Sequence, residues 1–181
     1  MTYYKDSDID IMKKSGVSDE DLEHCIKVAQ KAVEIAKRTT AEVDIELIAR
    51  GALLHDLGKS KTHGIEHGRI GAELGKELGL PSTITDIMEK HIRGGLTEDE
   101  AKELGLPVKD YSLKTIEEKI VIYADRLVDI ITEGIIELKD ERGSETRFEE
   151  IIKQNIKYGK NDITTRRYME YHKEIQSLMK T

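Results

Sequence analysis

Histidines of this sequence occupy positions from which their side chains can share a metal ion. His24 and His55 lie 31 positions apart, and their midpoint falls between Thr39 and Thr40, in the expected connection between two helices. Residues equally far from such a turn lie level across an antiparallel helix pair, because each residue adds about 1.5 Å of helix. The two imidazoles are therefore predicted to face one point.

Two carboxylates belong to the same predicted site. Asp56 follows His55 directly, where a helix is expected to end and its carbonyl groups favour a cation. Gly51 and Ala52 are expected to leave space on that side. Asp125 interrupts a distant apolar stripe, where an ionised carboxylate needs a cation or several donors. Two imidazoles and two carboxylates suit a divalent transition metal.

A second histidine pair repeats the symmetry. His67 and His91 are centred on Gly79, at the start of the next expected turn. Three interpretations stay open for them: direct metal ligands, a hydrogen-bonded core pair, or groups that contact a substrate. We expect direct ligation, which gives enough ligands for two ions with Asp56 as the bridge.

The elements that must position these residues are predicted to be helices throughout. Apolar residues recur every three to four positions, and no long segment alternates apolar and polar residues. Ser18, Asp44 and Thr115 are candidate N-terminal caps. Helices are expected over 18–38, 44–55, 66–78, 82–91, 115–131, 148–158 and 163–179, with a charged connector over 137–147.

The 181 residues predict one compact all-α domain. We divide it into a short N-terminal segment (1–17), a core (18–131) and a C-terminal helical extension (132–181). The extension either packs on the same core or forms the surface of a homodimer.

Bulk properties exclude several functions. A formal net charge of −7 argues against a nucleic-acid-binding surface. The start of the chain lacks a basic segment followed by an apolar one, and no apolar run reaches membrane-spanning length, so a cytoplasmic protein without membrane contact is expected. Cys25, the only cysteine, cannot form an internal disulfide and is assigned no role.

From Ser18 to Ile131 the chain resembles the HD-domain superfamily of metal-dependent phosphohydrolases, whose pattern is a His, then His-Asp, then a distant Asp. His24, His55-Asp56 and Asp125 match that pattern. The segment His55-Asp56-Leu57-Gly58-Lys59 is similar to the HDIG variant, with Leu for Ile.

Further motifs distinguish among the branches of this superfamily. The placement of His67 and His91 is similar to that in members with two metals, such as the bacterial HD-type diadenosine tetraphosphate hydrolases. The chain has neither a GYP element nor a His-His pair after His91, unlike the HD-GYP branch. After Asp125 it continues Arg126-Leu127-Val128, as in many nucleotide-acting HD proteins and unlike the continuation expected in the diadenosine tetraphosphate hydrolases.

The resemblance implies hydrolysis of a phosphomonoester or phosphoanhydride bond in a nucleotide or a similar small metabolite. One or two divalent ions are expected, with Fe or Mn favoured and Co, Ni, Zn or Mg as other options. The expected metal ligands are His24, His55, Asp56, His67, His91 and Asp125. Asp56 and Lys59 are the expected catalytic residues, and Lys59, Arg126, Arg93 and Arg69 are the expected phosphate-binding residues.

Two other functions and several structural roles stay open. HD-fold proteins include di-iron oxygenases with the same six ligands, and a non-catalytic nucleotide-binding module is a third option. Lys59 also suits a helix C-terminus without any function. His63 is expected in a solvated loop and His172 on a helix surface, and Asp129 is expected at the surface or beside a metal ligand.

Overall fold

The structure is a computed structural model that describes residues 2–181, and it confirms the all-α class. Thr39 and Met179 form a β-bridge, but no strand occurs within the described residues. The helices are α1 (Asp6–Ser15), α2 (Asp19–Arg38), α3 (Ile45–Leu54), the 3-10 helix η1 (Leu57–Ser60), α4 (His67–Glu77), α5 (Ser82–Lys90), η2 (Ile92–Gly94), α6 (Glu98–Glu103), α7 (Ile116–Thr132), α8 (Gly143–Thr146), α9 (Phe148–Gln154), α10 (Ile156–Gly159) and α11 (Asp162–Ser177). Across residues 2–181, each helix is too short or too polar to cross a lipid bilayer.

The helix starts follow the expected capping chemistry. Ser18 Oγ accepts a hydrogen bond from the backbone N–H of the third residue of α2, and Asp44 Oδ1 does the same for α3. Thr115 and Glu118 form a reciprocal capping box at the start of α7. Each side chain satisfies a backbone donor that the helix itself leaves unpaired, so these three starts lie where the sequence places them.

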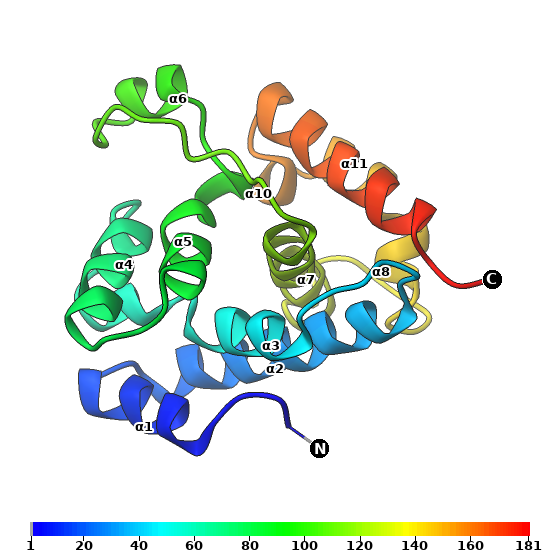
Figure 1. Cartoon of the computed structure of the whole chain (residues 1–181). Helices are drawn as coiled ribbons and strands as arrows, with labels where there is room; N and C mark the ends of the chain where they lie inside the picture. The colour runs from blue at the N-terminus through cyan, green and yellow to red at the C-terminus, as the bar shows by residue number, and fades with distance from the viewer. Residues whose placement is uncertain (1) are drawn as a thin grey trace.

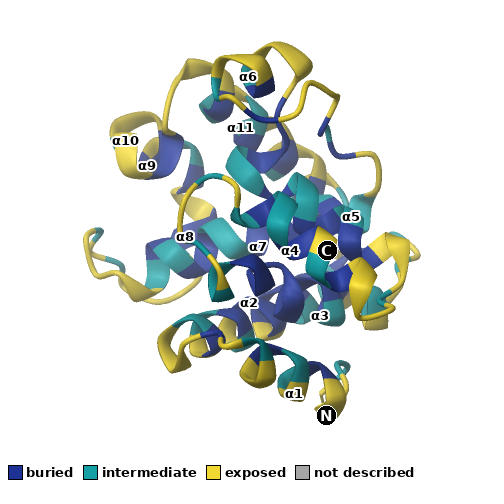
Figure 2. Cartoon of the chain, turned by 90° about the vertical axis from the view of Figure 1, so that its left-hand side faces the viewer, coloured by how far each residue is buried: buried dark blue, intermediate teal, exposed yellow. Residues whose placement is uncertain are grey.

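The core forms around α3 and α7. In Figure 1, α7 lies at the centre, with α2 and α3 on one side, α4 and α5 on a second and α11 on a third. Figure 2 shows that buried residues are concentrated in these helices, whereas α6 and α10 carry much exposed surface. The second half of α3, from Gly51 to Leu54, is buried, as its apolar sequence predicts, because α2, α5 and α7 all pack against this helix.

Gly51 has a different role from the one expected. A Cβ atom at this position would lie 2.5 Å from Ile87 Cδ1 of α5. The missing side chain therefore lets α3 and α5 pack closely, and it leaves no space for a metal ion. The expectation that Gly51 provides room beside His55 was wrong.

Two helices outside the predicted ranges depend on tertiary contacts. In α1, the buried Asp8 accepts hydrogen bonds from Arg50 Nε and Nη2 of α3 at 2.9 and 3.1 Å. A separate small apolar cluster of Leu96, Ala101, Leu106 and Tyr111 holds α6. Neither segment has a long apolar stripe of its own, so local periodicity did not indicate them.

The C-terminal helices pack against α7. Tyr168, Tyr171 and Ile175 of α11 are buried there. The helix predicted over 148–158 is interrupted at Asn155, whose backbone is extended (φ −121°, ψ 106°), and it forms α9 and α10 instead. The charged connector includes the short α8, where Glu145 is bound by Arg38 of α2.

Candidate metal centre

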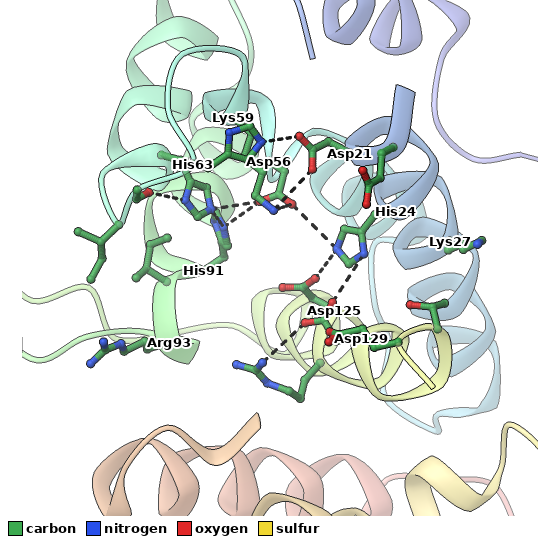
Figure 3. Close-up of a pocket in the computed structure, with 18 of the residues that line it drawn as sticks. Asp21, His24, Lys27, Asp56, Lys59, His63, His91, Arg93, Asp125 and Asp129 are labelled. Carbon is green, nitrogen blue, oxygen red and sulfur yellow. Dashed lines mark hydrogen bonds and ion pairs between the residues drawn. The ribbon is translucent and has the colours of Figure 1, made fainter. Parts of the chain in front are cut away.

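The six predicted ligands come together from six places in the chain. Figure 3 shows Asp56 between His24 on one side and His91 on the other, with Asp125 beside His24. They have these origins: His24 in α2, His55 at the end of α3, Asp56 before η1, His67 at the start of α4, His91 at the end of α5 and Asp125 in α7. The site thus joins α2, α3, α4, α5 and α7, the five helices that the sequence predicts for the core.

The first group is His24, His55 and Asp125. The ring centroids of His24 and His55 are 5.9 Å apart, as expected for residues level across the α2–α3 hairpin. Asp125 Oδ1 lies 2.8 Å from His24 Nε2 and 3.5 Å from His55 Nε2. One ligand atom from each residue is therefore available to a common ion.

The second group is His67, His91 and Asp56. The Nε2 atoms of the two histidines are 2.8 Å apart, and each lies 3.2 Å from Asp56 Oδ1. Close backbone packing places His67 here. A Cβ atom on Gly68 would lie 2.9 Å from the carbonyl oxygen of Met88, so only glycine lets α4 approach α5 this closely.

Gly58 has a related role in the turn that follows Asp56. A Cβ atom on Gly58 would collide with the backbone carbonyl of His67. Glycine at this position therefore allows η1 to touch the start of α4. The spacing of Asp56 and Gly58 in the sequence thus brings the aspartate and the second histidine pair together.

Hydrogen bonds fix the tautomer of three histidines. His55, His67 and His91 each place Nδ1 near the carbonyl oxygen three residues earlier, at 2.6, 2.8 and 2.6 Å. A carbonyl oxygen only accepts, so each Nδ1 carries the proton. In the neutral rings, Nε2 then presents a lone pair to the centre of the site, which is the arrangement of histidines that bind metals through Nε2.

This donor set fits bound divalent cations. The buried Nε2 of His55 has no hydrogen-bond partner among the described residues. The lone pairs of His67 and His91 face each other and Asp56 Oδ1, so three acceptors meet with no donor between them. A cation in each group would satisfy all of them, and ligands of this type suit a transition metal.

The electrostatics of the site also favour positive charge. Burial lowers the pKa of His55, but the charges of Asp56 and Asp125 raise it more, so it lies well above its ordinary value. Burial raises the pKa values of both carboxyls, but the charge of His55 and hydrogen bonds lower them well below the usual range. The pKa of His91 is lowered, first by burial. The two aspartates therefore stay ionised.

Lys59 lies directly beside the carboxylate. Its Nζ is 2.9 Å from Asp56 Oδ2 and 4.0 Å from Asp21 Oδ1. Burial lowers the pKa of Lys59. The charge of Asp56 and the hydrogen bond to it raise this pKa by more, so it lies well above its ordinary value. The side chain is consequently an ammonium ion that donates hydrogen bonds and does not take up a proton.

A cavity of about 800 Å³ opens from this centre. Arg93 and Arg126 line it, as does Lys59. Arg69 does not: it binds Glu73 one turn along α4 at 2.9 Å and lines a separate small cavity instead. The structure therefore does not bring Arg69 to the predicted phosphate-binding group, because its position on α4 directs it to another face.

Two other polar residues, Asp129 and His63, were also placed from the sequence. Asp129 Oδ1 lies 3.7 Å from His24 Nδ1, and burial together with the charge of Asp125 raises the pKa of Asp129 to about 7. His63 is exposed and lies 2.8 Å from Asp21 Oδ2. Both residues lie where they were expected.

His172 was expected on a helix surface, and this expectation was wrong. The side chain is half-buried, its Nδ1 accepts a hydrogen bond from Tyr123 OH at 2.6 Å, and the ring stacks on Phe148. The tyrosine and phenylalanine come from α7 and α9, and nothing in the local sequence links them to His172.

Cys25 lies near His55 and Asp56, so its sulfur is geometrically close to the first group. Burial raises the pKa of the Cys25 thiol, which disfavours the thiolate form that binds metals. We therefore leave Cys25 out of the candidate ligand set.

The sequence did not point to two residues of the cavity wall, Lys160 and Tyr168. Both belong to the C-terminal helices, which carry no motif that relates them to the histidines. The sequence predicted a helix over 163–179 but did not indicate which surface it covers.

Comparison with known proteins connects this geometry to a family. The HD domain model matches residues 21–129, which is more than half of the chain. An uncharacterized protein of Methanocaldococcus jannaschii is 43% identical over 171 residues, which cover 92% of this chain and 94% of that protein. A tRNA (cytidine(56)-2′-O)-methyltransferase of Thermoplasma volcanium is 44% identical over 119 residues, which cover 66% of this chain but only 35% of that protein.

A solved structure shares the fold. The HD domain of the L. monocytogenes phosphodiesterase PgpH, in complex with cyclic-di-AMP, superposes with a TM-score of 0.62 at 19% identity. The match covers 93% of this chain and 95% of the PgpH domain. With the matched model spanning His24 through Asp125, the chain belongs to the HD domain family.

Proposed function

We propose that this protein is a metal-dependent phosphohydrolase that acts on a nucleotide or a related small phosphorylated metabolite. It cleaves a phosphomonoester or phosphoanhydride bond with a water molecule as the nucleophile. The metal ligands are His24, His55, Asp56, His67, His91 and Asp125, and the ions are Fe or Mn in preference to other divalent metals.

One observation carries this proposal: the two oxygens of Asp56 face two different groups of ligands. Oδ1 lies 3.2 Å from both His67 Nε2 and His91 Nε2. Oδ2 lies 3.3 Å from His55 Nε2 and 4.0 Å from His24 Nε2. A carboxylate that faces two acceptor groups in this way suits a pair of ions with Asp56 as the bridge.

Divalent ions held there would lower the pKa of a water molecule and neutralise charge on the phosphate oxygens. The protein's own residues hold and orient the substrate. Lys59 keeps its positive charge beside Asp56, where it can bind a phosphate oxygen. Arg126, the residue after Asp125, lines the same cavity and can bind a further phosphate oxygen of the substrate.

The family relationship and the relatives support this class of reaction. The PgpH domain belongs to a phosphodiesterase and was solved with a cyclic dinucleotide. Because the two chains are only 19% identical, this likeness supports the shared fold and does not identify the substrate. Dinucleoside polyphosphates, the substrates of the diadenosine tetraphosphate hydrolases that the sequence resembles, are also candidates. The methyltransferase relative matches over a third of its length, so methyl transfer is not part of the proposal.

The C-terminal extension belongs to the same functional unit in this proposal. Lys160 and Tyr168, from α10–α11, line the cavity that opens from the metal centre. Residues 18–131 alone would lack this part of the wall. We therefore assign the ligands to the core (18–131) and part of the substrate pocket to the extension (132–181).

The test is phosphate release from a panel of nucleotides and dinucleotides by protein loaded with Mn or Fe. The Asp56→Asn variant keeps the side-chain volume and removes the bridging charge. We expect at least about a 100-fold loss of turnover, because changes to groups that only orient metal ligands already cost 10- to 100-fold. Glu20→Gln, on the exposed rim of the same cavity, is the matched control and should keep wild-type turnover.

Two outcomes would overturn the proposal. Wild-type turnover by a folded Asp56→Asn variant would show that the reaction does not need the Asp56 carboxylate. Oxygen consumption by the iron-loaded protein with an organic substrate, without any phosphate release, would establish the oxygenase alternative.

A further inference from the structure

Two cationic residues on the cavity wall have unusual backbone conformations. Among residues 2–181, Arg93 (φ 49°) and Lys160 (φ 64°) are the non-glycine residues with positive φ. Both line the cavity that opens from the metal centre, although they come from different parts of the chain. Figure 3 shows Arg93 apart from the cluster of His24, Asp56 and Asp125.

Lys160 forms the centre of a classic γ-turn. Its φ and ψ are 64° and −72°, and the N–H of Asn161 donates to the carbonyl of Gly159 at 2.8 Å. This turn is rare and strained for a residue with a side chain. Strain of this kind persists where the surrounding structure enforces it, and it is concentrated at functional sites. The strained turn places Lys160 on the wall of the cavity.

The loop that contains Arg93 is held by α11. Arg167 Nη1 donates to the carbonyl oxygen of Arg93 at 2.9 Å, and Tyr171 OH donates to that of Gly94 at 2.6 Å. These bonds fix the left-handed backbone of Arg93. The Arg93 side chain itself has no hydrogen bond or ion pair within the described part of the chain, so the backbone is held by α11 while the guanidinium is unpaired.

Tyr168 joins this loop to a third cation. The guanidinium carbon of Arg126 lies 4.8 Å from the Tyr168 ring centroid, and Arg126 Nη2 donates to Tyr168 OH at 3.3 Å. The Tyr168 ring also packs on Gly94, where a Cβ atom would lie 3.1 Å from Tyr168 Cε2. The buried Nε of Arg126 has no hydrogen-bond partner among the described residues, so the protein leaves one donor of this guanidinium unsatisfied.

Lys160 lies close enough to the other two cations for their charges to act on it. Burial lowers the pKa of Lys160, and the charges of Arg126 and Arg93 lower it further. Nearby carboxylates balance only part of this charge, because Asp129 Oδ2 lies 3.6 Å from Arg126 Nη1. Glu133 is paired with Lys157, and Asp129 lies beside both His24 and Arg126. Such a concentration of positive charge is notable in a chain whose net charge is −7.

We propose that Arg93, Arg126 and Lys160 form a second phosphate subsite, which binds a phosphate group other than the one that reacts at the metal centre. The proposal rests on the proposed function, and it narrows the substrate to small molecules that carry two phosphate groups. Arginine pairs bidentately with phosphate oxygens and lysine acts as a point charge, so the three side chains suit one phosphate.

Equilibrium binding to the metal-loaded full-length protein tests the subsite without relying on turnover. The first pair of ligands is phosphorothioate-linked ApA with and without a 5′-phosphate. The second is the α,β-methylene analogue of ADP against adenosine 5′-phosphorothioate. In each pair only one ligand carries the extra phosphate group, and the two pairs distinguish a dinucleotide from a nucleoside polyphosphate. We expect the wild-type protein to prefer the two-phosphate ligand in one pair by about tenfold or more, the effect of one charge-assisted hydrogen bond.

Variants that tolerate positive φ keep the backbone intact while they remove charge. Lys160→Asn and Arg93→Asn should each reduce that preference by about tenfold, because asparagine adopts left-handed conformations more readily than most residues. Lys160→Arg should keep it. Lys153→Asn removes the same charge from α9, away from the cavity, and should bind like the wild-type protein. Thermal melts establish that each variant is folded.

The outcomes separate the subsite from the hydrolase proposal. Equal binding of both ligands in each pair by the wild-type protein would overturn the subsite, and so would an unchanged preference in folded Lys160→Asn and Arg93→Asn. A preference that these two variants lose, in a protein that hydrolyses no phosphate compound, would retain the subsite and reject the proposed function.

Discussion

The Nε2 atoms of His67 and His91 lie 2.8 Å apart while both rings donate from Nδ1 to carbonyl oxygens, so two lone pairs face each other. We predict that an ion binds between these rings and Asp56. Wild-type protein should hold about two divalent ions per chain, and His67→Ala about one, because the first ligand group is unchanged. Elemental analysis after reconstitution with Mn measures this.

His63→Ala is the control for this experiment. The residue lies in the loop just before His67, but its side chain is exposed and bound to Asp21. It should retain the wild-type metal content. Two ions per chain in a folded His67→Ala variant would exclude His67 from the ligand set.

Lys59 provides a prediction for substrate binding. Lys59→Met removes the ammonium beside Asp56 and keeps much of the apolar stem. If Lys59 binds a phosphate oxygen, kcat/KM should fall by about tenfold or more, with unchanged metal content. Lys27→Met is the matched control, since Lys27 lines the same cavity but pairs with Glu23 on the α2 surface. A wild-type kcat/KM for Lys59→Met would assign the lysine a purely structural role.

Much of the candidate site could be predicted from the sequence, because helical periodicity and the position of a turn determine which residues lie side by side on two paired helices. The His24–His55 pair and the His67–His91 pair were predicted from symmetry about two connections, and the structure brings each pair together. Asp125 was predicted from the cost of a charge on an apolar stripe. That these residues bind metal stays a prediction, as does the division at residue 131.

What the sequence did not indicate depends on contacts between distant segments. Lys160 reaches the cavity through a strained turn, and neither its neighbours nor any periodicity relates it to Arg93. Asp8 in α1 can be buried because Arg50 of α3 donates hydrogen bonds to its carboxylate, a contact that the local sequence does not predict. Tertiary packing determines these contacts, and local sequence patterns do not predict them.

The close packing of α3 on α5 at Gly51 predicts a specific cost. Gly51→Ala should lower the free energy of unfolding by about 1–3 kcal/mol, because the new methyl group meets Ile87 Cδ1 and must displace it. Ile87→Val removes that atom, so the double variant should lose less stability than the sum of the two single variants. Urea denaturation measures all three.

Gly64→Ala is the control for that series, since its nearest neighbour, Thr62 Oγ1, would be 3.3 Å from the added Cβ in an exposed turn. Its stability should change little. Strict additivity of Gly51→Ala and Ile87→Val would contradict the proposed contact between them.

The pairing of Glu145 with Arg38 predicts how stability depends on pH. Arg38 donates two hydrogen bonds to Glu145, at 2.8 and 3.1 Å, and Gln176 donates a third. Burial raises the pKa of Glu145, but these bonds and the charge of Arg38 lower it more, to below its ordinary value of 4.5. A carboxyl with a depressed folded-state pKa stabilises the fold above its unfolded-state pKa, and this contribution is lost as the pH falls through the folded-state value.

Glu145→Gln should therefore be less stable than the wild-type protein at pH 7, by about 1 kcal/mol, because Glu145 is buried while its partner Arg38 is partly exposed. The difference should shrink as the pH falls below 4.5, because the wild-type carboxyl then becomes neutral as well. Urea denaturation from pH 7 to about pH 3 follows both proteins. Glu150→Gln, in an exposed pair with Arg147, should differ little from wild type at any pH. A Glu145→Gln deficit that is independent of pH would instead assign the loss to packing and not to the charge of Glu145.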